Sequence, residues 1–294
     1  MTRRGILLAG ASALLAAGRG DESRLSVEGY IFQQYAQRQH KKLTDVLPEV
    51  IPMARNAGFH NIELNAEFFA PDVKSTTLDL VHSNGLRMPS VYAGGRLHEA
   101  ALAETTTAHV LETGKTCQPF GCVAIVFNAN PKGEGVEKTD AELAFQAQAL
   151  NRLGRNLSEN GLDLRVHNHT PEMVNGAREW RHTLEHTDPR FVSLCLDLDW
   201  VEQGGQVPLA LLKLAGSRVH EIHARSSEHK LWLEAFGPGD IDYSAVAAYL
   251  KNAGLDPLIV VELAYRENTA VKRPLEDDLR ASRIYAENVF ALKA

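Results

Sequence analysis

The chain has few cysteines and no excess of positive charge. Its 294 residues include three cysteines, Cys117, Cys122 and Cys195, too few and odd in number for a disulfide framework. Each lies in or beside an apolar segment, so we expect buried free thiols. The formal net charge of −6 provides no general attraction to nucleic-acid phosphates. We therefore expect no nucleic acid among the partners.

Long apolar runs are also missing, except near the N-terminus. There the basic start Met1–Arg4 is followed by an apolar run from Ile6 to Ala17 and then by small residues. This run is too short to span a bilayer but has the form of a signal peptide, and Arg3-Arg4 resembles a twin-arginine export signal. We expect residues 1–20 to be a leader of a periplasmic or exported protein without a stable membrane anchor, with a cytoplasmic protein as the alternative.

The chain further lacks a glycine-rich phosphate loop after its first predicted strand and a low-complexity linker. The first absence disfavours a doubly wound open sheet, and the second favours one domain over residues 24–294. Eight short apolar runs alternate with amphipathic stretches, a pattern that predicts a closed (β/α)8 TIM barrel. The expected strands are 25–32, 61–64, 88–92, 123–127, 162–167, 192–197, 219–223 and 258–262. The expected helices are 43–57, 72–84, 100–113, 140–160, 176–186, 208–215, 243–253 and 274–292.

What the sequence does have is a metal-type ligand at the end of each of the last four predicted strands. These residues are His167, Asp197, His223 and Glu262. Ligands at the same end of successive parallel strands converge at the top of such a barrel. Two imidazoles and two carboxylates suit one divalent ion, with manganese as our expectation and magnesium, cobalt or zinc as alternatives.

The alternation of side-chain direction along each strand indicates that the ligands face the barrel interior. In the sixth strand Leu194 and Leu196 share one phase and Asp197 has the other, so Asp197 points to the barrel axis if the leucines face the helices. The same argument turns His223 inward and His220 outward, and leaves Glu262 inward at the end of the eighth strand.

Several segments together resemble the sugar phosphate isomerase/epimerase family of xylose isomerase-like TIM barrels. They cover nearly everything after residue 25 and comprise 58–64, 166–169, 196–201 with 204–205, 218–223, 239–242 and 260–262. The resemblance implies the fold named above and one divalent metal on the fifth- to eighth-strand ligands. It also implies a small-molecule carbohydrate as substrate.

The fifth strand departs from the family pattern. Related ketose 3-epimerases have a glutamate there that is both ligand and acid/base, whereas this chain has His167. A metal-bound imidazole is a poor proton carrier, so Glu172 is a candidate for the missing carboxylate, as base or as ligand. His169 has the same strand phase as His167 and is a third possible ligand. Glu262 is expected to act as both ligand and catalytic base.

Five further residues are candidates for substrate binding. Glu63 ends the second strand, Trp200 follows the sixth-strand ligand, and Arg225 and His229 follow the seventh; His169 is the fifth candidate. For each, a purely structural role such as capping, packing or a solvated loop is the alternative.

These residues suit proton abstraction next to a carbonyl through an enediolate. We expect a sugar isomerase or epimerase acting on a keto sugar or related polyol. A lyase or dehydratase acting on inosose-like or 3-keto-glycoside substrates is the alternative, because the same intermediate expels a β-leaving group, and a fifth-strand histidine resembles inosose dehydratases. A non-catalytic sugar-binding barrel is a second alternative. The sequence is compatible with a homo-oligomer.

Overall fold

The computed structural model describes residues 24–267 and 269–292. Eight parallel strands form a closed barrel in the order β1-β10-β7-β6-β5-β4-β3-β2. The barrel strands are β1 (Leu25–Glu28), β2 (Asn61–Asn65), β3 (Ser90–Gly95), β4 (Ala124–Ala129), β5 (Asp163–His167), β6 (Ser193–Asp197), β7 (Val219–Ala224) and β10 (Leu258–Val261). The predicted TIM barrel is thus confirmed, while the predicted leader, residues 1–20, lies outside the described residues.

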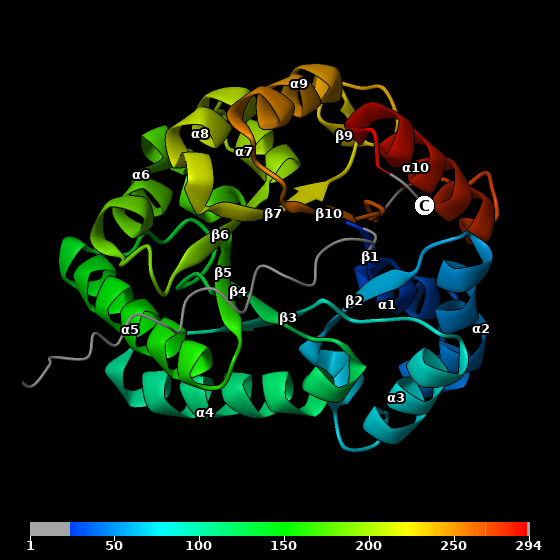
Figure 1. Ribbon diagram of the computed structural model, residues 1–294, viewed down its shortest axis with the longest axis horizontal. Coiled ribbons are helices and arrows are strands. Elements are labelled where there is room, and N and C mark those ends of the chain that lie inside the picture. Colours follow the sequence, from blue (N-terminus) through cyan, green and yellow to red (C-terminus); the bar gives the residue numbers. More distant parts are fainter. Residues whose placement is uncertain (1–23, 268, 293–294) are drawn as a thin grey trace, which may run out of the picture.

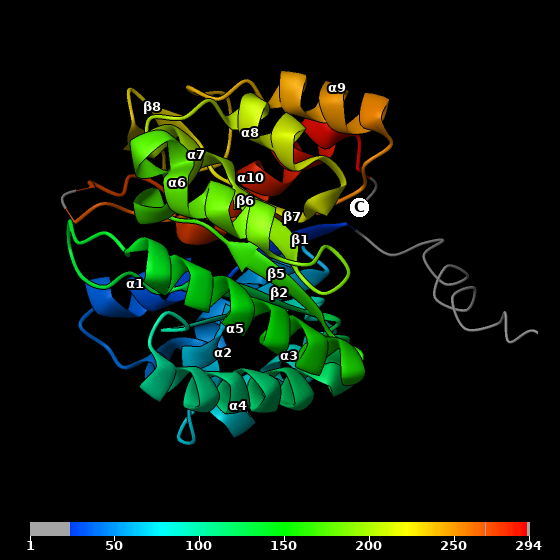
Figure 2. The same cartoon turned by 90° about the vertical axis from the view of Figure 1, so that its left-hand side faces the viewer.

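Helices form the outer layer around these strands (Figure 1 and Figure 2). They are α1 (Tyr30–Arg38), α2 (Leu43–Asn56), α3 (Lys74–Ser83), α4 (Ala100–Cys117), α5 (Asp140–Glu159), α6 (Thr170–His186), α7 (Leu198–Gln203), α8 (Pro208–Ala215), α9 (Tyr243–Ala253) and α10 (Leu275–Phe290). Short 3-10 turns lie at Ala66–Phe69, Gln118–Phe120 and Gly216–Arg218. In the described part of the chain, no helix combines the length and the apolar character needed to cross a membrane.

Local sequence signals explain where several helices begin and end. The Thr139 side chain accepts a hydrogen bond from the Glu142 N–H while Glu142 accepts one from the Thr139 N–H, a capping box that starts α5. Asp242 caps α9 in the same manner through the Ala245 N–H. Gly254 ends α9 with a φ of 66°, a conformation that glycine adopts without steric cost.

The predicted strand 25–32 and the predicted helix 176–186 are wrong in their boundaries. The first strand does not continue to Phe32: it ends at Glu28, and α1 begins at Tyr30. Gly29 makes this turn, because it donates to the Glu63 carbonyl and because a side chain at this position would meet Leu64 at 2.7 Å. The sixth helix begins at Thr170 instead of residue 176, and non-helical dihedral angles interrupt it between Val174 and Ala177.

The barrel interior contains buried polar side chains in its middle layers. Glu63, Ser90, Arg165 and Glu221 are all almost fully buried there, where TIM barrels usually place branched apolar residues. Apolar residues of the alternate phase, such as Leu194 and Ile222, pack outward in the hydrophobic core. These polar side chains can therefore form contacts inside the barrel that extend to the ends of the strands.

Candidate metal centre

The four predicted ligands come together at the C-terminal ends of their strands. One ligand atom from each of His167, Asp197, His223 and Glu262 lies within 4.8 Å of the others, and all four residues are buried. The register explains the convergence, because Asp197 pairs with His223 across β6 and β7, and Glu262 directly follows the last residue of β10. Two nitrogens and two carboxylate oxygens at this spacing fit the bond lengths of a four- to six-coordinate divalent ion.

The His167 ring provides the clearest test of whether these residues fit a metal. Neither of its nitrogens has a hydrogen-bond partner among the described residues, although the side chain is buried. An unsatisfied buried polar group is costly, so a ligand at this imidazole is the physical explanation. Burial and the positive charge of His223 lower the pKa of His167 well below its usual value, which keeps the ring neutral and able to coordinate.

Arg225 lies beside the two carboxylate ligands. Its Nη2 donates to Asp197 Oδ2 at 2.8 Å and to Glu262 Oε1 at 2.5 Å. Burial by itself opposes ionisation, yet the positive charges of Arg225 and His223 hold the pKa of Glu262 below its usual value. The second oxygen of Asp197 accepts from the Trp200 N–H at the start of α7. Both carboxylates are therefore fixed in place and Glu262 is ionised.

His223 is flanked by carboxylates on both ring nitrogens. Nδ1 lies 2.8 Å from Glu262 Oε2, and Nε2 lies 3.0 Å from Glu63 Oε1. Burial opposes the charged ring, but the negative charge of Glu63 raises the pKa of His223. A metal at Nδ1 takes the place of a proton, so binding should release protons and weaken as the pH falls.

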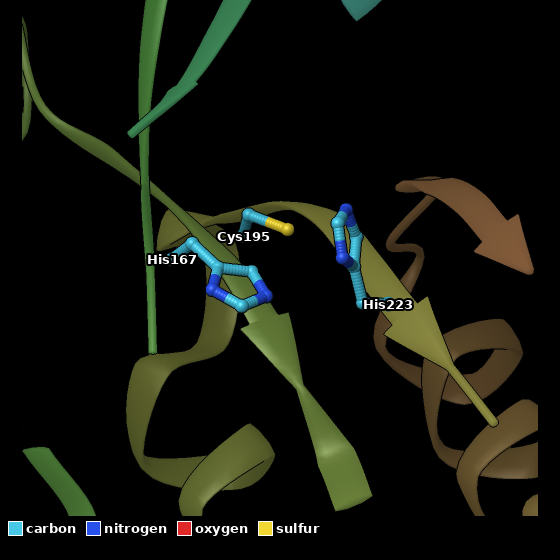
Figure 3. Close-up of side chains that lie close together, drawn as sticks. All are labelled: His167, Cys195 and His223. Atoms are coloured by element: carbon cyan, nitrogen blue, oxygen red, sulfur yellow. The ribbon is translucent and has the colours of Figure 1, made fainter. Parts of the chain in front are cut away.

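Cys195 lies one layer below the centre, two residues before Asp197. Its sulfur lies close to His167 and His223, as Figure 3 shows. Burial raises the pKa of the thiol, so Cys195 remains a neutral, free cysteine. The two other cysteines are also buried and free, as predicted from the sequence.

A cavity of about 440 Å³ opens above the four ligands. Trp200 and Trp232 meet edge to face in its wall, with ring centroids 5.3 Å apart, and the Arg225 guanidinium lies 5.0 Å and 4.7 Å from the two rings. Aromatic walls and a few converging polar groups are typical of a small-molecule site. The lining residues are Glu28, Tyr30, Asn65, Tyr92, His167, His169, Thr170, Pro171, Trp200, His223, Arg225, Trp232 and Glu262.

Three of the five predicted substrate-binding residues lie in this cavity: His169, Trp200 and Arg225. Glu63 lies beneath it, fully buried against His223. His229 lies outside it on the hairpin formed by β8 (Ser227–Glu228) and β9 (Leu231–Trp232), where its N–H donates to Asp240.

Glu172 is also outside the cavity lining. Its side chain accepts a hydrogen bond from the His169 N–H and so caps α6. It does not belong to the buried ligand group that contains His167. His169 is likewise absent from this group, and His167 is its member from the fifth strand.

Glu28 and Tyr92 are among the cavity residues that were missed in the sequence. Glu28 ends β1, and burial together with the negative charges of Glu262 and Glu63 raises its pKa well above its usual value. Tyr92 packs edge-on against His167 at 5.2 Å, and its hydroxyl lies 3.4 Å from His169 Nε2. The position of Glu28 at the end of a strand was the available signal, which the overlong first predicted strand concealed.

Comparison with known proteins agrees with this geometry. The family model "Xylose isomerase-like TIM barrel" matches residues 51–285. The chain is 29% identical to the inosose dehydratase of Bacillus velezensis over 77% of this chain and 84% of that protein. With the inosose dehydratase of Geobacillus thermodenitrificans it shares 27% identity over 51% of this chain and 55% of that protein.

Among solved structures, a sugar phosphate isomerase/epimerase from Parabacteroides distasonis superposes with a TM-score of 0.71. The superposition covers 96% of this chain and 99% of that one at 17% identity, a similarity that concerns the fold. With a family model that matches most of its length, the chain belongs to the xylose isomerase-like TIM barrel family.

Proposed function

We propose that the chain is a divalent-metal-dependent enzyme that removes a proton from the carbon next to a carbonyl group of a sugar or cyclic polyol. The convergence of four buried ligands, three of which line an aromatic-walled cavity, carries this proposal. A bound divalent ion polarises the substrate carbonyl and makes the neighbouring C–H more acidic.

Glu262 is the residue suited to take that proton. It lines the cavity, and Arg225 keeps it ionised. Trp200 and Trp232 exclude water from one wall and offer apolar faces to the C–H groups of a ring. A carboxylate in this position removes a proton that the carbonyl has acidified.

The second carboxyl group of the cavity favours elimination as the outcome. Glu28 lies on β1, which pairs with β10, and both Glu28 and Glu262 directly follow the paired residues Val27 and Val261. Both carboxyls therefore approach the substrate from one side of the barrel. Glu262 would take the proton, the C–H electron pair would form the C=C bond, and a β-hydroxyl would leave as water with a proton from Glu28.

The inosose dehydratase relatives support the same outcome for this chain. A cyclic polyol with a carbonyl group is accordingly the substrate class that we favour, with loss of water as the reaction. Magnesium, manganese, cobalt and zinc all remain candidates for the ion, because nitrogen and oxygen ligands accept each of them.

Epimerisation or isomerisation is the second candidate, and Tyr92 with His169 favours it. Tyr92 lies on β3, which only β2 separates from β1, and His169 follows β5, which is opposite β1 in the barrel. The Tyr92 hydroxyl, which burial keeps protonated, would return a proton to the opposite face of the substrate. Glu172, the displaced carboxylate that the sequence suggested for this role, is outside the cavity lining.

Incubation of the metal-loaded protein with inososes and keto sugars in deuterated water tests the proposal. Both outcomes begin with loss of the proton from the carbon next to the carbonyl. Epimerisation or isomerisation adds deuterium from the solvent to the sugar, whereas elimination forms a C=C bond at that carbon and releases water. NMR detects both products, and chelation should abolish both reactions. A product with a conjugated carbonyl identifies elimination, and an inverted or isomerised sugar identifies the second candidate. Sugar binding with neither deuterium uptake nor loss of water in the metal-loaded protein would refute both and indicate a non-catalytic barrel.

Glu28→Gln distinguishes the two outcomes. If Glu28 protonates the leaving hydroxyl, water loss should fall by ~10²-fold or more while deuterium uptake continues, because general acid catalysis typically contributes that much. Glu262→Gln is the matched variant and should abolish both. Unchanged water loss in Glu28→Gln would contradict the assignment of Glu28.

A further inference from the structure

A continuous chain of polar contacts runs through the barrel from its opposite end to His223. It starts at His220, whose ring is about half exposed at the N-terminal end of β7 and lies 2.8 Å from Asp163. Asp163 contacts Arg165 at 3.1 Å, and Arg165 contacts Glu221 at 2.6 Å.

Within the barrel the chain continues through Ser90 and Glu63. The Ser90 hydroxyl lies 3.0 Å from one Glu221 oxygen and in close hydrogen-bond contact with Glu63 Oε2. The other Glu63 oxygen lies 3.0 Å from His223 Nε2. Ser90, Glu63 and Glu221 are completely buried, so each of these contacts is made in a low-dielectric interior without competing water.

The last contact places the Glu63 carboxylate beside the His223 nitrogen that does not face Glu262. The Nε2 atom of His223 lies 3.0 Å from Glu63 Oε1, and Nδ1 lies 2.8 Å from Glu262, one of the other ligands. A carboxylate on the far nitrogen of a metal-bound imidazole sets its tautomer and ring orientation and increases its basicity.

Glu63 cannot contact a substrate in this arrangement. It is fully buried and absent from the residues that line the cavity; one of its oxygens lies 3.0 Å from His223 Nε2 and the other accepts a hydrogen bond from Ser90. Its contacts are those of a residue that acts through the imidazole.

We propose that Glu63 is a positioning residue of the metal centre, which orients His223 through Nε2, and that Ser90, Glu221 and Arg165 hold Glu63 in place. This inference rests on the proposed function, since it assumes that His223 binds a metal. Arg165 stabilises the arrangement by compensating the charge of Glu221 at 2.6 Å.

Metal affinity of the Glu63→Gln variant tests the inference. The substitution retains the shape and removes the charge, so the affinity for Co²⁺ and Zn²⁺, measured by chelator competition, should fall by ~10- to 100-fold. In the zinc-loaded wild type, ¹⁵N NMR of the imidazoles should show His223 protonated at Nε2. Ser90→Ala should weaken binding less, because it leaves the Glu63 contact with His223 intact.

Glu179→Gln is the matched control. Glu179 is another buried glutamate in an ion pair, 2.6 Å from Lys138, but it lies outside this chain of contacts. We expect it to lower the melting temperature without altering metal affinity, which separates an effect on folding from an effect on the ligand.

Three results would overturn the inference. A folded Glu63→Gln protein with wild-type metal affinity would show that the carboxylate is not needed. A His223 protonated at Nδ1 in the zinc form would contradict the stated orientation. A wild-type chain that binds no divalent ion would overturn the proposed function as well, whereas loss of turnover alone would leave the metal measurements valid.

Discussion

Glu172 is a buried carboxyl at the start of α6, with 5% of its surface exposed. Burial, reinforced by the negative charge of Glu179, raises its pKa from 4.5 to about 7. The folded chain therefore retains this proton up to a higher pH than the unfolded chain does. Because the folded state binds more protons between these values, stability falls as the pH rises from 4.5 to 7.

We predict that Glu172→Gln stabilises the protein relative to the wild type more at pH 8 than at pH 5. The amide still accepts the hydrogen bond from the His169 N–H but carries no charge, so the gain at pH 8 approaches ~3 kcal/mol at most. Urea unfolding of both proteins at the two pH values measures it. A difference between variant and wild type that does not depend on pH would contradict the pKa assignment.

The ligand residues could be predicted because strand alternation determines the direction of each side chain. Strand alternation has a period of two, so the outward leucines of β6 determine the inward direction of Asp197. Alternation gives Glu28 the inward phase of β1, but the predicted strand 25–32 hid the fact that the strand ends there. Arg225 follows the last residue of β7, so no such periodicity predicts it. His229 looked similar to Arg225 in sequence, yet the hairpin carries it away from the cavity.

At the scale of secondary-structure elements, the glycines of α4 and α5 show where helices approach their neighbours most closely. A Cβ on Gly154 would lie 2.1 Å from the Phe191 carbonyl oxygen, which belongs to the backbone. A Cβ on Gly114 would lie 2.6 Å from Leu162 Cδ1, the end of a side chain. The first neighbour moves only if the β5–β6 connection moves, and the second has rotamers available.

We predict that Gly154→Ala destabilises the protein by ~1–3 kcal/mol, the usual cost of overpacking. Without the close contact, alanine would stabilise the helix by ~1 kcal/mol relative to glycine. A decrease in the free energy of unfolding would therefore show that the contact is too close for a Cβ atom. Gly114→Ala is the matched control and should cost less. Equal urea midpoints for Gly154→Ala and the wild type would show that α5 has room to shift.

Predicted helices and strands agree with the structure where the apolar residues follow a single clear period, that of a helix or that of a strand. Helices such as 208–215 and 243–253 have the predicted bounds, since the amphipathic pattern and the caps coincide. The strand predicted for 25–32 is too long because Ile31 and Phe32 are apolar and buried in α1, and their sequence pattern would fit a buried strand equally well. Helix α7 and the β8–β9 hairpin are too short for any periodicity to show.

For the whole molecule, the N-terminal segment suggests export, and we propose that the mature protein functions outside the cytoplasm. The basic Met1–Arg4 and the apolar run after it motivate this proposal. N-terminal sequencing of the protein from its native host should find a start near residues 18–24, and Arg3-Arg4→Lys-Lys should retain the precursor in the cytoplasm. Recovery of intact Met1 from the cytoplasm alone would refute it.

The two tryptophans of the cavity wall also provide an optical signal. The chain has three tryptophans; Trp200 and Trp232 line the cavity beside Arg225, and Trp180 is buried in α6. Ligands that enter the cavity change the polarity around two of the three indoles. The intrinsic emission of the protein should therefore report occupancy directly, without a coupled assay or a label, and allow unknown carbohydrates to be screened by titration.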